Sequence, residues 1–269
     1  MAKRGRKIQG DHKLTGMEIK RRQDDKAASI DGELDQALAG IDWDRRREAE
    51  KDIVKWVKTY CVPLMLNDDP PELGEGVLRY MYGAVNSHSN YMIAMPRGHG
   101  KTSYVECVTL FALATGLHKY VVVISNNARA ASGIMTDIWR GIAETDTPFS
   151  QDYPEVCLPF QVCNGSFRRR QLYKGASTDI QKNSGNIVLA RLRREDGSEF
   201  PTSGSILTCR GVSSGIRGMK FGKLRPTCAL LDDLQTSEIA ENPEAVSKLM
   251  QIIRKDVMPL AGKERLSVL

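Results

Sequence analysis

The start of the chain changes from a polar stretch to a helical pattern. Residues 1 to about 32 are rich in Lys and Arg and hold few large apolar side chains, so we expect a basic, flexible arm. Over residues 33–62, apolar side chains recur at spacings of three, four and seven, beginning with Leu34 and Leu38. This period predicts an N-terminal helical segment, which Pro63 closes.

Beyond residue 63 the pattern alternates between short apolar runs and helical periods. The run Tyr120–Ser125, YVVVIS, is typical of a parallel strand buried on both faces, and Asn127 is placed to cap the helix after it. Alternating strands and helices predict an α/β fold with a mainly parallel central sheet flanked by helices. We expect strands at 91–95, 120–125, 166–175, 186–211 (a hairpin turning near 195–204) and 227–233, the start of a strand at 264–269, and helices at 102–115, 128–144 and 243–257.

Composition narrows the class of protein. Of the 269 residues, 41% are hydrophobic and 27% are charged, which is ordinary for a globular protein with a sizeable core. No apolar run approaches the length of a membrane span, and the basic N-terminus lacks the apolar stretch of a secretory signal. We therefore expect a cytosolic protein without a membrane partner. The six cysteines form no C-x-x-C pair and the four histidines lack zinc-ligand spacing, which argues against a structural metal site.

Residues 96–103, PRGHGKTS, are typical of a phosphate-binding loop. The standard loop is G-x-x-x-x-G-K-[ST]; Gly100, Lys101 and Thr102 supply its end, while Met95 stands at its first glycine. In such a loop, backbone N–H groups bind the phosphates, the lysine reaches the β- and γ-phosphates, and the hydroxyl holds Mg²⁺. The alternative is a chance Gly-Lys-Thr, which the flanking strand and helix disfavour. The predicted nucleotide-binding residues are Pro96, Arg97, Gly98, His99, Gly100, Lys101, Thr102 and Ser103.

A second strand supplies the acids that such a loop needs. The sequence ALLDDLQ ends an apolar run with Asp232 and Asp233, at the edge where ligands collect in parallel sheets. Asp232 and Thr102 are the predicted Mg²⁺ site, and Asp233 is predicted to orient the attacking water. For the acids alone, the alternative is a helix cap beside a solvent-facing carboxylate. Joined to Lys101, they favour nucleotide hydrolysis.

Three motifs in order resemble a known family. Arg97 lies within the loop in the pattern R-x-x-G-K-[ST], SSGIRG follows at 213–218, and LLDDLQ follows at 230–235. This series resembles the ATPase domain of large terminase subunits, the motors that package double-stranded DNA into tailed-phage and herpesvirus capsids. The resemblance covers about residues 91–269. It implies a P-loop NTPase fold of the ASCE type over 63–269 and ATP hydrolysis, with ATP and Mg²⁺, coupled to DNA translocation.

The resemblance also implies roles for individual residues. Arg97 matches the loop arginine that senses or grips the γ-phosphate. Asp233 stands where the family usually has the catalytic glutamate, which shortens the side chain by one methylene. Arg217, in SSGIRG, matches a finger that reaches into the neighbouring subunit's site, although a surface turn is an equal alternative. The other arginines that could take the finger role are Arg129, Arg140 and Arg210.

The family likeness extends to partners and location. It implies double-stranded DNA, a homo-oligomeric ring that is a pentamer on assembly, a portal protein and a small terminase subunit. The expected location is the host cell cytoplasm, with transient docking on the viral procapsid. The family's C-terminal nuclease domain is not found in this sequence, so we expect an excised ATPase domain or one half of a divided protein, without nuclease activity.

Basic stretches raise the question of where DNA would bind. The net charge of +6 favours a polyanionic partner. Arg168 and Arg170 would share one face of a strand, and Arg191 and Arg193 one face of another, as a row of phosphate contacts requires. A solvated hairpin or a subunit interface is the competing interpretation.

Other functions remain open from the sequence. A helicase-like translocase would use the same core, and a DNA-associated module could hold nucleotide without hydrolysing it, as the aspartate at 233 allows. A small-molecule kinase is disfavoured because no lid or acceptor pocket is evident.

Overall fold

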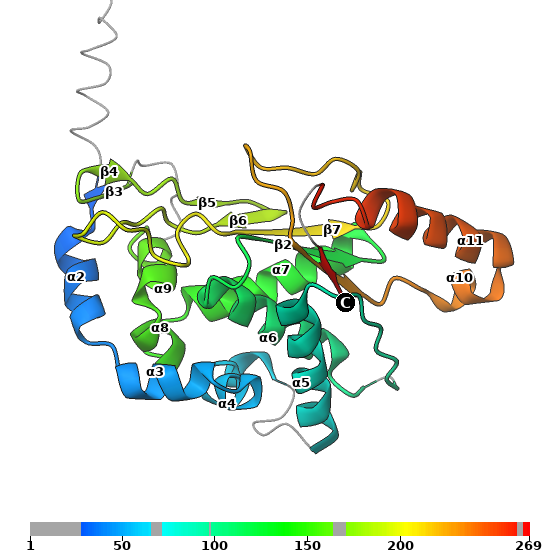
Figure 1. The fold of residues 1–269 in the computed structure, drawn as a ribbon, viewed down its shortest axis with the longest axis horizontal. Helices are drawn as coiled ribbons and strands as arrows, with labels where there is room; N and C mark the ends of the chain where they lie inside the picture. The colour runs from blue at the N-terminus through cyan, green and yellow to red at the C-terminus, as the bar shows by residue number, and fades with distance from the viewer. Residues whose placement is uncertain (1–27, 66–71, 97, 164–170, 263–265) are drawn as a thin grey trace, which may run out of the picture.

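The computed structural model describes residues 28–65, 72–96, 98–163, 171–262 and 266–269, so most of the predicted arm lies outside the described residues (Figure 1). The helices are α2 (Asp31–Ala39), α3 (Trp43–Glu50), α4 (Ile53–Tyr60), a 3₁₀ turn (Val62–Leu64), α5 (Glu72–Ser87), α6 (Lys101–Ala114), α7 (Ala128–Ala143), α8 (Pro148–Asp152), α9 (Pro154–Gln161), α10 (Ser237–Glu241), α11 (Pro243–Ile252) and a π-helical turn (Ile253–Val257). The strands are β1 (Ala28–Ser29), β2 (Tyr120–Ser125), β3 (Gln171–Tyr173), β4 (Ala176–Ser177), β5 (Gln181–Lys182), β6 (Asn186–Val188), β7 (Ile206–Gly211), β8 (Cys228–Asp232) and β9 (Ser267–Val268).

The chain is an α/β protein with mixed sheets flanked by helices. The larger sheet has the strand order β5-β6-β7-β2-β8-β9, and β1, β3 and β4 form a smaller one. Strands β7, β2, β8 and β9 are parallel, whereas β5, β6 and β7 pair antiparallel. The prediction of a mainly parallel sheet is therefore only partly right. The hairpin at 186–211 joins the sheet through β7, and consecutive hairpin strands must run antiparallel.

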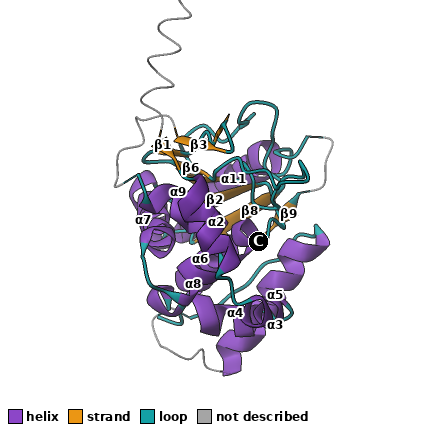
Figure 2. Ribbon diagram, turned by 90° about the vertical axis from the view of Figure 1, so that its left-hand side faces the viewer, coloured by secondary structure: helices purple, strands orange, loops and turns teal. Residues whose placement is uncertain are grey.

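Different helices pack against the two faces of the larger sheet. Val121 and Val123 of β2 point into a large cluster built with helices α4 to α9. Val122 and Ile124 point the other way, toward residues of α11 and its π-helical turn. Figures 1 and 2 show α4 to α7 on one side of the sheet and α11 on the other. The β2 prediction is confirmed, because a strand covered on both faces is apolar at every position.

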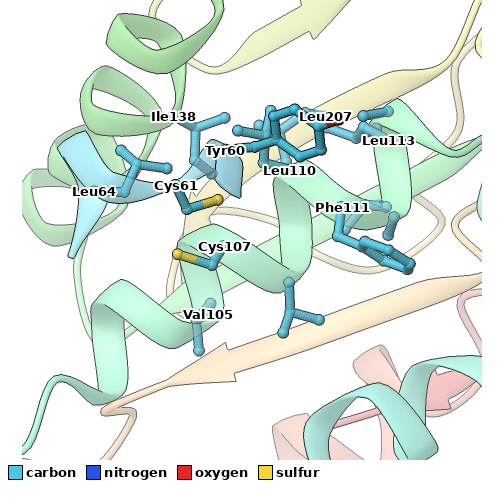
Figure 3. Close-up of a cluster of buried hydrophobic side chains, with 14 of the residues drawn as sticks. Tyr60, Cys61, Leu64, Val105, Cys107, Leu110, Phe111, Leu113, Ile138 and Leu207 are labelled. Atoms are coloured by element: carbon cyan, nitrogen blue, oxygen red, sulfur yellow. The ribbon is translucent and has the colours of Figure 1, made fainter. Parts of the chain in front are cut away.

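Helix α6 lies at the centre of the larger cluster. Residues 104–114 are all buried, and Figure 3 shows Val105, Cys107, Leu110 and Phe111 surrounded by Ile138 and other apolar side chains. A helix buried on all sides loses the usual apolar stripe, which explains why this one is apolar almost throughout. The position of its N-terminus, and so of Lys101, is thereby fixed.

The strand predicted at 91–95 is wrong. Asn90 forms a parallel bridge with Val268, and the Tyr91 N–H donates to the Val268 carbonyl at 2.8 Å, but residues 92–96 are irregular. Met92 is 88% exposed, whereas Ile93 and Met95 are half-buried and pack against the core without pairing in the sheet.

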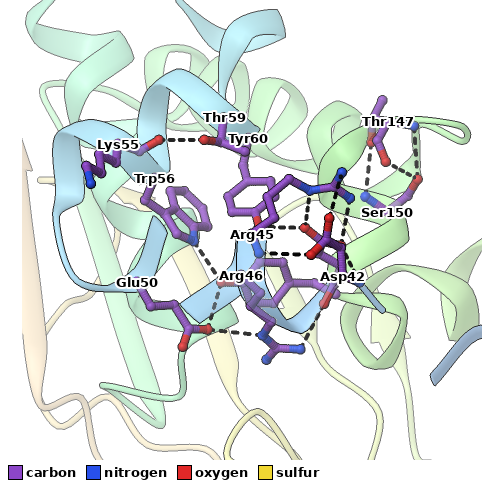
Figure 4. A network of polar contacts seen from close by, with 12 residues as sticks. Asp42, Arg45, Arg46, Glu50, Lys55, Trp56, Thr59, Tyr60, Thr147 and Ser150 are labelled. Carbon is purple, nitrogen blue, oxygen red and sulfur yellow. Dashed lines mark hydrogen bonds and ion pairs between the residues drawn. The ribbon is translucent and has the colours of Figure 1, made fainter. Parts of the chain in front are cut away.

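The predicted N-terminal helical segment is three helices, and a polar network holds two of them against the rest (Figure 4). The fully buried Asp152 carboxylate accepts from Arg45 Nε at 2.6 Å, from Arg45 Nη2 at 2.8 Å and from the Tyr60 hydroxyl at 2.6 Å. Arg46 donates to Glu155 at 2.8 Å and lies 4.0 Å from the centre of the Tyr153 ring. Helices α3 and α4 are therefore tied to α8 and α9 by charge as well as by packing.

No helix in the described part of the chain has both the length and the apolar character needed to cross a bilayer.

The Asp152 network generates a stability prediction. Substituting Asp152→Ala leaves the Arg45 guanidinium and the buried Tyr60 hydroxyl without their acceptor, so we expect a loss of about 3–5 kcal/mol in the free energy of unfolding. Urea denaturation followed by circular dichroism measures it. The control is Asp44→Ala, which removes the exposed pair with Arg47 and is expected to cost less than about 1 kcal/mol. Equal losses in the two variants would contradict the role of the network.

Candidate functional site

Two glycines shape the loop before α6. Gly98 has φ of 80° and Gly100 has φ of 73°, both in the left-handed region that favours glycine. A Cβ at Gly98 would meet no atom within 4 Å, so the backbone conformation and not space requires the glycine there. Gly100 is the N-cap of α6, and the free N–H groups of the first turn begin directly after it. This arrangement suits the binding of an anion.

Lys101 folds back over its own loop. Its Nζ donates to the Met95 carbonyl at 2.9 Å and to the Pro96 carbonyl at 3.4 Å. The same Nζ lies 3.9 Å from Asp233 Oδ1. The ammonium group is thus held at the centre of the loop by acceptors that a phosphate oxygen can replace.

Thr102 and Asp232 meet although they are 130 residues apart. The Thr102 hydroxyl lies 3.2 and 3.3 Å from the two carboxylate oxygens of Asp232. The contact follows from topology: β8 is parallel to β9, and Asn90 bridges β9 in the same direction, so the loop and Asp232 emerge at one edge. A hydroxyl beside a carboxylate is the type of oxygen pair that Mg²⁺ binds.

The surroundings of the Asp232 carboxyl disfavour its ionised form. It is 7% exposed, and burial raises its pKa, as does the neighbouring Asp233, while the Thr102 hydrogen bond and Lys101 oppose the rise. A bound cation would favour the ionised carboxylate. No group of three or more His, Cys, Asp or Glu side chains able to hold a metal occurs among the described residues. The fit to Mg²⁺ therefore depends on Thr102 and Asp232.

Asp233 differs from Asp232 in its exposure and in its backbone conformation. It is exposed, and its φ of 41° is in the left-handed region, which aspartate tolerates better than most residues. The turn directs the chain away from β8 and leaves the carboxylate facing Lys101.

Polar groups at the end of β2 extend this edge. Ser125 is paired in register with Asp232 and is 1% exposed. Its Oγ and the Oδ1 of Asn126 have no hydrogen-bond partner among the described residues. Buried polar atoms without partners are costly, so these two are available to a water or ligand beside the carboxylates.

The remaining predicted site residues are not gathered around the two aspartates. Ser103 lies in the first turn of α6, and His99 is exposed in the loop. Arg97 lies outside the described residues.

Arg217 is exposed between Gly215 and Gly218, whose φ values are 69° and 70°, and makes no described contact with the loop or the two aspartates. The structure thus joins Lys101, Thr102, Asp232 and Asp233 and leaves Arg217 on the surface.

The arginines predicted to bind DNA can be placed in part. Arg168 and Arg170 lie outside the described residues. Arg191 lies 3.8 Å from Asp179, and Arg193 lies 3.6 Å from Glu199. Both described arginines are exposed but have a carboxylate beside them, which offsets their charge.

Glu106 is a buried acid close to the candidate site that was not expected from the sequence. It lies one helical turn after Thr102 on α6 and is 5% exposed. Burial raises the pKa of Glu106 to about 8, and Asp137 and Asp232 add to the rise, while Arg140 opposes it. The signal was present, because an acid within the apolar run YVECVTLF is unusual.

Comparisons with known proteins do not assign a family. No protein-family model matches the chain, and no curated protein matches it.

Glu106 generates a prediction about pH. Between about pH 4.3, the ordinary pKa of glutamate, and a folded pKa of about 8, the folded chain keeps a proton that the unfolded chain has lost. The free energy of unfolding must then fall as pH rises through this window, by up to about 1.4 kcal/mol per pH unit. In Glu106→Gln we expect this part of the fall to disappear.

Urea denaturation at pH 6 and pH 8.5, in buffer with a chelator, measures the effect. The exposed Glu244→Gln serves as the control and is expected to keep the parent's pH dependence. The assignment fails if Glu106→Gln shows the same fall in stability as the parent chain.

Proposed function

We propose that this chain is an ATP-hydrolysing motor domain of the large-terminase type, with a P-loop NTPase fold of the ASCE type. It would drive translocation of double-stranded DNA into a procapsid. The observation that carries the proposal is the meeting of Thr102 with Asp232 at 3.2 and 3.3 Å, beside Lys101 and Asp233. A phosphate loop alone is weak support. Its contact with two acids from a distant strand supplies the parts that phosphoryl transfer needs.

Each residue has a distinct role in the proposed hydrolysis. The Gly98 and Gly100 backbone lets the loop and the first turn of α6 surround the phosphates. Lys101 exchanges its carbonyl acceptors and Asp233 for phosphate oxygens. Thr102 and Asp232 would hold Mg²⁺, which supplies positive charge to the phosphate oxygens when bound. Asp233, released from Lys101, accepts a hydrogen bond from the attacking water and orients it.

Arg217 supports the proposal of a ring. Its side chain is exposed, and no described contact ties it to the site of its own chain. An arginine of this kind is suited to enter the site of a neighbouring subunit and stabilise charge in the transition state. The portal protein and small terminase subunit belong to the same proposal and rest on the motif resemblance alone.

A second candidate function is a module that holds nucleotide without hydrolysing it. It is favoured by the approach of Lys101 to Asp233, because an aspartate is one methylene shorter than the glutamate usual in the family. In that case Asp233 would hold the lysine in the empty state and take no part in chemistry.

The ring proposal is tested by ATP hydrolysis per subunit as a function of protein concentration. We expect a rate that rises with concentration as subunits assemble, and a loss of about 10³-fold or more in Lys101→Ala and in Arg217→Ala. Mixing the two variants should restore part of the rate, since each supplies what the other lacks. A rate independent of concentration would remove Arg217 from the finger role.

Asp233 separates the two candidate functions. For hydrolysis, Asp233→Asn should lower kcat by about 10²-fold or more, since the amide cannot accept a proton, while nucleotide binding strengthens because Lys101 loses a competitor. Asp233→Glu should keep activity. Single-turnover hydrolysis and equilibrium binding of a fluorescent ATP analogue measure the two effects. A parent chain that binds the analogue without hydrolysing ATP would favour the module that only binds nucleotide, whereas an unchanged kcat in Asp233→Asn would remove Asp233 from the water-orienting role.

A further inference from the structure

The segment between β7 and β8 carries an unusual run of positive charge. Residues 213–226, SSGIRGMKFGKLRP, contain Arg217, Lys220, Lys223 and Arg225 and no acid. This segment starts near the edge where Asp232 lies and returns above the sheet to the opposite edge, where β8 begins (Figure 1). We refer to residues 213–226 as the basic crossover.

Apolar side chains fix the path of the basic crossover. Ile216 is buried in the cluster on the α11 side of the sheet, and Met219 and Phe221 pack against the same face. Phe221 and Leu224 exchange two backbone hydrogen bonds of 3.0 Å, which places Lys223 in a tight turn after Gly222. The apolar residues hold the segment down, so the cations between them point outward.

These cations lack counterions among the described residues, unlike the arginines of the 186–211 hairpin that were expected to bind DNA. All four are exposed, and none forms an ion pair with another described residue. Arg191 and Arg193 by contrast each have a carboxylate within 4 Å. An uncompensated row of cations produces a stronger positive potential than a paired one of equal number.

The basic crossover ends at a cavity of about 740 Å³ on the amino edge of the sheet. Cations from separate segments line it: Lys119, Lys223 and Arg225, together with His88 and His118. No carboxylate occurs among the described lining residues. The cavity is far from the phosphate loop in the topology, since it lies where β2 and β8 begin and the loop lies where they end.

Hydrogen bonds hold the side chains that line this cavity. His118 lies 2.9 Å from the Val85 carbonyl through Nε2 and 3.0 Å from the Thr227 hydroxyl through Nδ1. Nε2 must donate to the carbonyl, so Nδ1 accepts from Thr227, and burial lowers the pKa of this histidine. Lys119 Nζ donates to the Ser203 carbonyl at 2.8 Å. At Gly262, whose φ is 68°, a Cβ would lie 3.2 Å from Arg225 Cδ, so the glycine leaves room for the arginine stem.

We propose that Lys220, Lys223 and Arg225 of the basic crossover, with the adjoining cavity, bind successive phosphates of a nucleic-acid backbone. Phosphate is the ligand that a row of exposed cations without carboxylates recognises best. The choice of duplex DNA as the source of the phosphates rests on the proposed motor function. Such contacts hold the backbone without reading bases, as a translocating protein requires.

The test is the salt dependence of binding to a fluorescently labelled 30-base-pair duplex, followed by anisotropy. The variant is Lys220→Gln, Lys223→Gln and Arg225→Gln together. Its control is Arg191→Gln, Arg193→Gln and Arg194→Gln, which lowers the net charge equally, by three from +6 to +3. Each lost phosphate contact removes about 0.9 from the slope of log K against log salt concentration. We expect the crossover variant to lose about 2 to 3 from the slope and the control variant less than about 1.

Circular dichroism and the unfolding midpoint establish that both variants fold. If the triple crossover variant fails to fold, the pair Lys220→Gln and Lys223→Gln is used, with an expected loss of about 2 from the slope. An unchanged slope in a folded crossover variant would overturn the proposal. A larger loss in the control variant would also overturn it and move the contact to the 186–211 hairpin.

Competition identifies the source of the phosphate, and ATP hydrolysis keeps the two proposals separate. Displacement of the duplex by inorganic phosphate at matched ionic strength would assign the cavity to a free anion. Displacement by poly-glutamate at equal charge would assign the surface to an acidic polypeptide. Either result overturns the nucleic-acid proposal. A parent chain that binds duplex with the expected slope but does not hydrolyse ATP loses the motor function and keeps the crossover surface.

Discussion

The burial of α6 is the constraint on which the rest of the structure depends. Its residues 104–114 are enclosed by the sheet and by the neighbouring helices, so the helix cannot rotate or slide without exposing apolar surface. Because Lys101 and Thr102 begin this helix, packing far from the site sets their position. The same sheet carries Asp232 at the end of β8. The contact between Thr102 and Asp232 is therefore a consequence of core packing, not of local attraction.

The packing of α6 also places two carboxyl groups in the protein interior. Asp232 and Glu106 are both buried near the start of α6, and burial raises the pKa of each. Neither has a cation hydrogen-bonded to it in the described structure, in contrast to Asp152, which Arg45 contacts through two nitrogens. Native interiors rarely keep carboxyl groups under such conditions without a use for them. The electrostatics of this edge thus differ in kind from those of the network that holds α3 and α4.

Positive charge is also distributed unevenly. In the described residues the strand-like region at 191–194 lies beside carboxylates, whereas the basic crossover carries cations without ion pairs. The net charge of +6 does not show which of these two regions attracts a polyanion. A cation beside a carboxylate has its charge offset locally, whereas a cation without one does not. Position relative to carboxylates decides which arginines and lysines attract a polyanion. Only folding brings Asp179 and Glu199 to their partners.

The sequence by itself determined the features that depend on neighbours along the chain. The apolar run of β2, the Asn127 side chain that accepts from Ala130 N–H at the start of α7, and the glycines before Lys101 could all be predicted. Each is local, because a strand period, a helix cap or a left-handed glycine involves a few consecutive residues. The two acids ending β8 were likewise visible.

The tertiary structure decided everything that depends on distant segments. Residues 91–95 have the composition of a strand, yet only Asn90 and Tyr91 bond to β9 and residues 92–96 are irregular. Distant segments also decide three other features: the mixed sheet, the burial of Glu106, and which cations have a carboxylate beside them. Burial and pairing are properties of neighbours in space, and the sheet and core bring together residues that lie more than a hundred positions apart.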